Sequence, residues 1–208
     1  KSVRAELQRA DEKTVLTARG CAEGIFAGGS TNIDGALKTS LGMLTVKGQP
    51  SYVLFLTDGL PTVGTRDEHQ IAANALKANR IRARMFNFGV GFDVNTRLLD
   101  RLSNDHRGQS VYVRPNEDIE THVAALYNKI GSPLLTDLKV AIEFDRERKA
   151  SAPQSVSRVY PRNVSDLFHG EQLVLVGRYH HGGAARINLT GQVGKKKQNL
   201  LVFKIHRE

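Results

Sequence analysis

The sequence contains a single cysteine, Cys21, and therefore cannot form a disulfide within itself. No apolar run approaches the roughly 20 residues that a membrane-spanning helix needs. Aromatic residues make up only 6% of the chain and do not alternate with basic ones, as binding of single-stranded nucleic acid requires. These absences argue against a disulfide framework, a membrane span and a nucleic-acid partner. Cys21 itself is expected to be a small core residue of a helix rather than a nucleophile.

Basic residues outnumber acidic ones, and the excess is concentrated in the C-terminal part of the chain. The net charge is +9. Residues 1–132 carry 17 Lys and Arg against 14 Asp and Glu, whereas residues 133–208 carry 13 against 7. A solvated face is the simplest interpretation of this bias, but an acidic glycan or an anionic envelope surface would also match it.

Short apolar runs alternate with helix-like segments from about residue 14 to residue 130. The runs predict strands at residues 53–56, 81–88 and 109–113, and the first of these is expected to be covered on both faces. Apolar residues at three- and four-residue spacing predict helices at residues 14–26, 33–44, 65–79, 93–108 and 116–131. Strands that alternate with helices favour an α/β fold with a doubly wound parallel sheet.

Polar residues at the predicted helix starts identify candidate caps. Thr65 and Glu68 fit a capping box, in which the hydroxyl and the carboxylate accept hydrogen bonds from each other's free backbone amides. Asp93 and Asn116 are expected to cap the two helices that follow, and Gly131 to end the last one.

After residue 132 the pattern changes to that of antiparallel strands. Apolar residues at 138, 140, 142 and 144 alternate with other residues, which is the period of a half-buried strand. Further strands are predicted at residues 172–179, 185–190 and 199–206, and the polar segment 145–170 is expected to be rich in loops. We therefore predict two domains, an α/β domain at residues 1–132 and a small antiparallel β domain at residues 133–208.

Polar side chains lie where a parallel sheet would bind a ligand. Asp58 follows the predicted strand at residues 53–56, at the carboxyl end where open parallel sheets collect ligands. Ser30, Thr31 and Asn32 precede a predicted helix, and they either cap it or offer oxygen ligands to a hard cation such as Mg²⁺, Mn²⁺ or Ca²⁺. In the simpler interpretation, Ser30 or Thr31 is the N-cap and Asp58 only forms a turn. The residues alone leave both interpretations open.

Five segments carry a resemblance to a known family. They are GGSTNID at 28–34, LFLTDGLPTVG at 54–64, NFGVGFDVNTRLLDRL at 87–102, NKIGSPLLTDLKV at 128–140 and DLFHGEQLVLVGRY at 166–179. In this order they resemble the von Willebrand factor A domain and the C-terminal extension of inter-alpha-trypsin inhibitor heavy chains. Bacterial proteins that pair a VIT domain with a von Willebrand A domain are similar. The resemblance covers nearly the whole chain and implies a truncated, Rossmann-like von Willebrand A sheet followed by a β extension.

The resemblance also implies a metal-ion-dependent adhesion site. In the family, one strand of that site ends in Asp-x-Ser-x-Ser, a later loop supplies a threonine and another strand supplies an aspartate. Thr31 matches the loop threonine and Asp58 matches the strand aspartate, so these two residues are the expected metal ligands. An acidic group from a partner protein completes the shell of the cation. The resemblance therefore implies a cation-dependent binding module rather than an enzyme, in a secreted or cell-envelope protein.

One part of the family pattern is missing, because no Asp-x-Ser-x-Ser segment precedes Thr31. The chain also begins at Lys1 with neither a methionine nor an apolar signal segment, so we expect it to begin partway into the domain. The strand at residues 53–56 would then lack a neighbour and expose an apolar edge. The metal site would keep one carboxylate and one hydroxyl, so we expect weak Mg²⁺ binding by this chain and strong binding by the full-length protein.

Two other functions remain open. A hydrolase would use Asp58 as a nucleophile or a metal ligand, but it needs a second acid or a histidine near Asp58, and no motif supplies one. A structural matrix or envelope domain would carry a vestigial metal site. A phosphatase activity that depends on both Mg²⁺ and Asp58 would favour the hydrolase.

Overall fold

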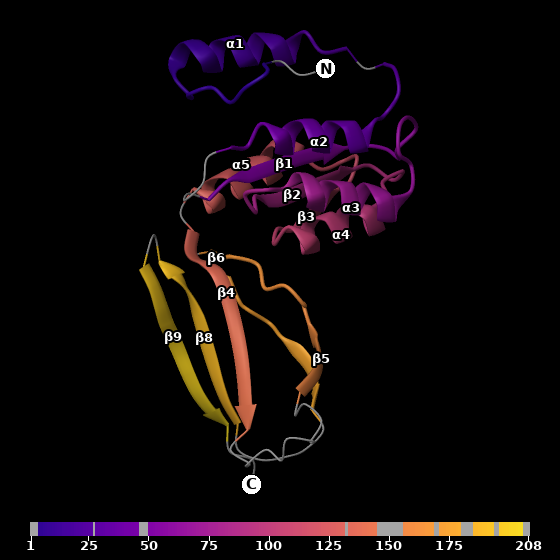
Figure 1. Ribbon diagram of the computed structural model, residues 1–208. Helices are drawn as coiled ribbons and strands as arrows, with labels where there is room; N and C mark the ends of the chain where they lie inside the picture. The colour runs from indigo at the N-terminus through magenta and orange to yellow at the C-terminus, as the bar shows by residue number, and fades with distance from the viewer. Residues whose placement is uncertain are drawn as a thin grey trace. The chain divides into compact units, whose positions relative to one another are not determined.

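The computed structural model describes residues 4–26, 28–45, 50–131, 133–144, 156–168, 171–179, 185–193 and 196–205. The chain divides into two compact units, Lys1–Glu117 and Asp118–Glu208, and Figure 1 traces their elements in chain order. Within the described ranges, no helix is both long enough and apolar enough to cross a membrane.

The first unit contains a parallel sheet of three strands. These are β1 (Tyr52–Thr57), β2 (Arg84–Val90) and β3 (Ser110–Val113), in the order β1-β2-β3. Thr57 lies opposite Gly89, and Phe88 lies opposite Val111. The carboxyl ends of the strands therefore lie at one edge of the sheet, and the predicted α/β fold with a parallel sheet is confirmed.

Helices α2 (Ile33–Gly42), α3 (Glu68–Ala78) and α4 (Thr96–Asp105) bury their apolar sides together with residues of β1 and β2. The core that they share consists of Ile33, Leu37, Leu41, Val53, Ile71, Ala72, Ala75, Ala83, Met85, Leu98, Leu99 and Leu102. Burial of one such leucine stabilises the fold by about 1.5–3 kcal/mol. This core fixes the starts of α2 and α3 next to the sheet, and the candidate site is built on those starts.

Strand β1 is less covered than the sequence predicts. It lies at an edge of the described sheet, where its neighbour is β2. Val53 is buried, but Leu54 and Phe55 are only half-buried and Leu56 is 47% exposed. The expectation of a strand covered on both faces was therefore wrong, because an apolar run reports what a strand can bury and not what lies beside it.

Helix α1 (Glu12–Glu23) begins earlier than predicted and buries none of its residues. Asp11 caps it: the Thr14 amide donates to Asp11 Oδ1 over 2.9 Å, and the Asp11 amide donates to Thr14 Oγ1 over 3.0 Å. Cys21 is exposed, so its predicted place in a core was wrong. The apolar spacing of this segment produces a helix, but that helix has no packed partner among the residues that the structure describes.

Three other helices are capped by a residue two positions beyond the predicted cap. Asp67 caps α3, Asn95 rather than Asp93 caps α4, and Asp118 rather than Asn116 caps α5 (Ile119–Ile130). The capping box predicted at Thr65 was therefore wrong. Several cap-forming residues precede each helix, and only the one whose side chain reaches a free amide of the first turn can serve. Gly131 follows the last residue of α5 as predicted.

The second unit contains α5 and antiparallel strands. One sheet has the order β6-β4-β8-β9 and a second pairs β5 with β7. The strands are β4 (Pro133–Phe144), β5 (Val156–Tyr160), β6 (Leu167–Phe168), β7 (Val176–Tyr179), β8 (Ala185–Val193) and β9 (Lys196–Ile205). The predicted antiparallel β region is confirmed, although the strand expected at 172–179 begins only at Val176. The described part of the segment expected to be loop-rich contains β5 and β6.

Helix α5 belongs to the second unit by its contacts. Lys129 forms an ion pair with Glu171, and its Nζ lies 5.3 Å from the centre of the Phe168 ring. The boundary between the two compact units therefore lies before α5, one helix earlier than the domain boundary predicted between residues 132 and 133. That domain boundary stays a prediction.

Candidate functional site

Asp58 lies immediately after β1, in a turn that the preceding residue stabilises. The Thr57 hydroxyl donates to the Gly59 carbonyl oxygen over 3.2 Å, and the Gly59 amide lies 3.4 Å from Thr57 Oγ1. Thr57 is buried, whereas Asp58 is exposed. Within the described part of the chain, the Asp58 carboxylate accepts no hydrogen bond and joins no ion pair, so its oxygens point to solvent and can accept a ligand.

Thr31 is held by its backbone. Its amide donates to Thr62 Oγ1 over 2.8 Å, and its carbonyl oxygen accepts from the amides of Thr62 and Val63 over 2.9 and 3.2 Å. Thr31 does not cap α2, because Asn32 does: Asn32 Oδ1 accepts from the Gly35 amide over 2.8 Å. The interpretation in which Ser30 or Thr31 is the cap was therefore wrong. The Thr31 hydroxyl makes no hydrogen bond with any residue that the structure describes.

The segment that follows β1, residues 58–65, is named here the site loop. The C-terminal end of the site loop packs closely against the start of α2. Gly64 has φ of 75°, and a Cβ atom there would lie 2.8 Å from Asn32 Oδ1. Glycine is favoured at this position, both for its backbone conformation and for the close approach. The structure thus brings together the segments that carry Thr31 and Asp58, the first of which precedes α2 and the second of which follows β1.

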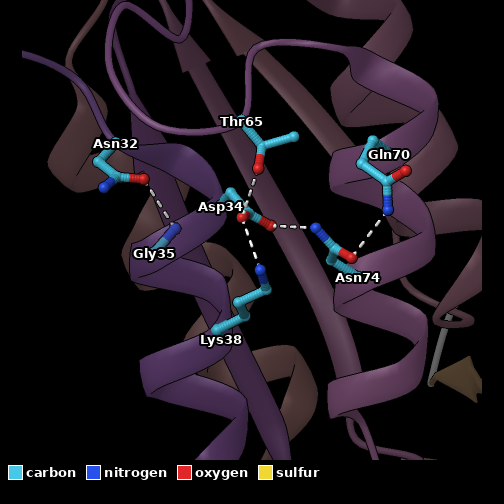
Figure 2. A network of polar contacts seen from close by, with 7 residues as sticks. All are labelled: Asn32, Asp34, Gly35, Lys38, Thr65, Gln70 and Asn74. Carbon is cyan, nitrogen blue, oxygen red and sulfur yellow. Dashed lines mark hydrogen bonds and ion pairs between the residues drawn. The ribbon is translucent and has the colours of Figure 1, made fainter.

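A buried carboxylate, Asp34, organises the polar contacts behind the site loop (Figure 2). Asp34 Oδ2 accepts from Lys38 Nζ over 2.7 Å and from the Thr65 hydroxyl over 2.9 Å. Asp34 Oδ1 accepts from Asn74 Nδ2 over 3.0 Å, and Asn74 Oδ1 in turn accepts from Gln70 Nε2 over 3.0 Å. One carboxylate therefore joins α2, the end of the site loop and α3.

The Thr65 hydroxyl thus donates to Asp34 and does not accept from a helix amide of the described residues. Glu68, its partner in the predicted capping box, has other contacts. Asp67 Oδ1 accepts from the Gln70 amide over 2.8 Å. The Glu68 carboxylate accepts from Asn95 Nδ2 over 2.9 Å and pairs with Arg97 Nε at 3.2 Å. The two contacts of Glu68 link α3 to the start of α4.

Asp34 remains ionised at neutral pH despite its burial. Burial by itself would raise the pKa of the Asp34 carboxyl, but the hydrogen bonds from Lys38, Asn74 and Thr65 outweigh it and lower the pKa below its ordinary value of 3.8. Asp34 was not among the predicted site residues. An acid in the first turn of a helix with a lysine four residues later was the available signal, but that pattern is common on solvated helices.

The donors present suit a hard cation in kind but are few in number. Asp58 offers a carboxylate and Thr31 a hydroxyl, and hard cations such as Mg²⁺ and Ca²⁺ prefer oxygen ligands of these types. No group of three or more His, Cys, Asp or Glu side chains that could hold a metal occurs in the described residues. The two candidate ligands can therefore form only part of a coordination shell.

Comparison with solved structures identifies the class of fold, although no family model matches the sequence. A von Willebrand factor type A protein from Catenulispora acidiphila superposes with a TM-score of 0.67 at 17% identity, over 97% of this chain and 52% of that one. The ArnB paralog VWA2 from Sulfolobus acidocaldarius superposes with a TM-score of 0.50 at 17% identity, over 89% and 49%. The fold is that of a von Willebrand factor A protein.

Sequence comparison shows which proteins the chain is related to. The chain is 30% identical over 205 residues to human inter-alpha-trypsin inhibitor heavy chain H4, and the aligned region covers 95% of this chain and 21% of that protein. It is 29% identical over 187 residues to heavy chain H2 of Sus scrofa, with 85% and 19% covered. The chain is a relative of the inter-alpha-trypsin inhibitor heavy chains, and the predicted resemblance is confirmed. It spans about a fifth of the length of these relatives.

Proposed function

We propose that this chain is part of a divalent-cation-dependent protein-binding module in which Asp58 and Thr31 supply two ligands of the cation. The observation that carries the proposal is the attachment of the site loop to Thr31 through Thr62 and Val63. This attachment holds the loop that begins with Asp58 against the start of α2. It uses the backbone of Thr31 and leaves the hydroxyl without a partner among the described residues.

The two side chains have different roles toward Mg²⁺, or toward Mn²⁺ or Ca²⁺ in its place. The Asp58 carboxylate would neutralise part of the charge, and the Thr31 hydroxyl would add a neutral oxygen. When bound, the cation supplies a positive charge that an acidic group of a partner protein can approach. Recognition of the partner would then depend on the cation.

Two protein oxygens are fewer than the roughly six ligands that Mg²⁺ takes. We therefore propose that this chain alone binds Mg²⁺ weakly. In the full-length protein an Asp-x-Ser-x-Ser segment would supply the remaining ligands.

The module is proposed to act by binding and not by catalysis. Support comes from Asp58, which has no acid or histidine partner among the described residues. Relatedness to the heavy chains supports a location outside the cytoplasm, in a secreted or cell-envelope protein. Exposed basic residues of the second unit favour an acidic glycan or envelope surface as a further partner; these include Arg178, Arg186, Lys196 and Lys197.

Calorimetric titration with Mg²⁺ tests the assignment. We expect Asp58→Ala in the full-length protein to abolish tight Mg²⁺ binding without changing the unfolding midpoint. Asp93→Ala is the matched control, since Asp93 is also an exposed acid in the connection after a parallel strand. Tight binding that survives Asp58→Ala would refute the assignment, and micromolar affinity of the present chain would refute the incompleteness of its site.

A further inference from the structure

The contacts that hold the site loop lead to Asp34, which is not itself a candidate ligand. Asp34 is only 6% exposed, and its two oxygens accept from Lys38, Thr65 and Asn74. These hydrogen bonds use three of the roughly four lone-pair sites of the carboxylate. Asp34 is therefore suited to position other groups.

The site loop is fastened at both ends. At its N-terminal end it continues directly from β1, whose backbone pairs with β2. At its C-terminal end the Thr65 hydroxyl donates to Asp34. Thr62 and Val63, the residues bonded to Thr31, lie between these ends. Gly59, Pro61 and Gly64 fall in the same segment, and glycines give such a loop many alternative conformations.

We propose that Asp34 is a positioning residue for the site formed by Thr31 and Asp58, acting through Thr65 to hold the site loop against the start of α2. This inference rests on the proposed function. Without the bond between Thr65 and Asp34, the loop would have to be ordered whenever a cation binds, and that ordering would reduce the affinity. The Asn74 amide steadies the same carboxylate from α3, so α3 also helps to fix the loop.

Thr65→Val is the most direct test, because it removes the hydroxyl and keeps the shape of the side chain. Thr65→Ser keeps the hydroxyl, and we expect this variant to behave as the unsubstituted chain does. Thr14→Val is the control: the Thr14 hydroxyl lies 2.9 Å from Asp11 Oδ1 and 2.5 Å from the Arg9 carbonyl oxygen, so this variant also removes a hydroxyl beside an aspartate, but at the start of α1.

Two measurements on the present 208-residue chain separate this inference from the proposed function. The first is hydrogen exchange at the amides of Thr62 and Val63, which donate to Thr31. The second is Mn²⁺-induced broadening of amide signals, with millimolar Mn²⁺ as the probe, at residues 31 and 58. We expect Thr65→Val to speed exchange about tenfold and to raise the Mn²⁺ concentration for half-broadening about tenfold, the loss expected for a hydrogen bond to a charged group. Thr65→Ser and Thr14→Val should match the natural chain.

Each outcome decides one of the two ideas. Unchanged exchange in Thr65→Val would overturn the positioning role, and so would faster exchange without any change in the Mn²⁺ response. Absence of localised broadening in the natural chain would overturn the proposed function, whatever the exchange shows. If Thr65→Val does not fold, Asn74→Ala removes a different donor to Asp34 and is expected to change both measurements in the same direction.

Discussion

Neighbouring residues of the GGSTNID segment have different roles because the backbone directs their side chains differently. The Asn32 side chain accepts from the Gly35 amide and caps α2. Thr31 precedes the cap, and its amide and carbonyl face the site loop. Ser30, Thr31 and Asn32 are equivalent candidates by residue type, so only the geometry of the helix start distinguishes a cap from a residue whose hydroxyl stays available.

The glycines of the site loop provide a test at this scale. Gly64→Ala places a Cβ at φ of 75° and 2.8 Å from Asn32 Oδ1, whereas a Cβ at Gly59 meets nothing within 4 Å. We expect Gly64→Ala to lower the free energy of unfolding by about 1–2 kcal/mol, and Gly59→Ala to change it by less than about 0.5 kcal/mol. Urea denaturation measures both. Equal effects of the two substitutions would contradict the close packing of the loop on Asn32.

At the scale of secondary-structure elements, Asp34 couples α2, the site loop and α3 only while it is ionised. Its pKa is lowered below 3.8 in the folded chain because the hydrogen bonds from Lys38, Asn74 and Thr65 outweigh its burial. The stability that it contributes is therefore complete above pH 3.8 and is lost as the pH falls through the lower folded-state value.

Asp34→Asn isolates this contribution. We expect the variant to unfold about 2 kcal/mol more easily than the natural chain at pH 7, and the difference to shrink as the pH falls below about 3.8. Other carboxyls with lowered pKa values, such as Asp11 and Asp118, titrate equally in both proteins and cancel in the comparison. Urea denaturation from pH 2 to pH 7 provides the measurement. A difference that stays constant over this range would exclude the ionised network.

The elements could be predicted from the sequence more fully than their ends. Apolar spacing predicts α2, α3, α4 and the parallel strands, because one face of each must enter the shared core. The starts of α3, α4 and α5 were misplaced, since several residues that can cap a helix precede each one. The link from Thr65 to Asp34 could not be predicted either, because it joins residues 31 positions apart and depends on how α2 and the site loop meet.

At the scale of the whole molecule, the alternation of strands and helices predicts a parallel sheet, and the later two-residue period predicts antiparallel strands. Both predictions are confirmed. Apolar periodicity in the sequence does not predict how far an element at the edge of the packed structure is buried. Cys21 on α1 and Leu56 on β1 are exposed, although burial was predicted for both from apolar spacing in the first segment and from an apolar run in the second. Burial depends on a neighbouring element, and a segment's own sequence does not contain that neighbour.

The edge of β1 leads to a prediction about association. The strand reads YVLFLT, without a charge or a proline, and lies at an edge of the described sheet. Natural proteins usually protect such edges with charged side chains or proline, because unpaired backbone groups recruit other strands. We therefore expect the present chain to self-associate as its concentration rises, and static light scattering to detect the association.

Leu56→Lys places a charge on this strand at a position that is already 47% exposed, so little burial is lost. Leu76→Lys is the matched control, because Leu76 is 55% exposed and belongs to the helix α3, not to a strand. We expect Leu56→Lys to reduce the scattering severalfold and Leu76→Lys to leave it unchanged, with equal unfolding midpoints. An equal reduction by both variants would point to general hydrophobic association and against pairing through β1.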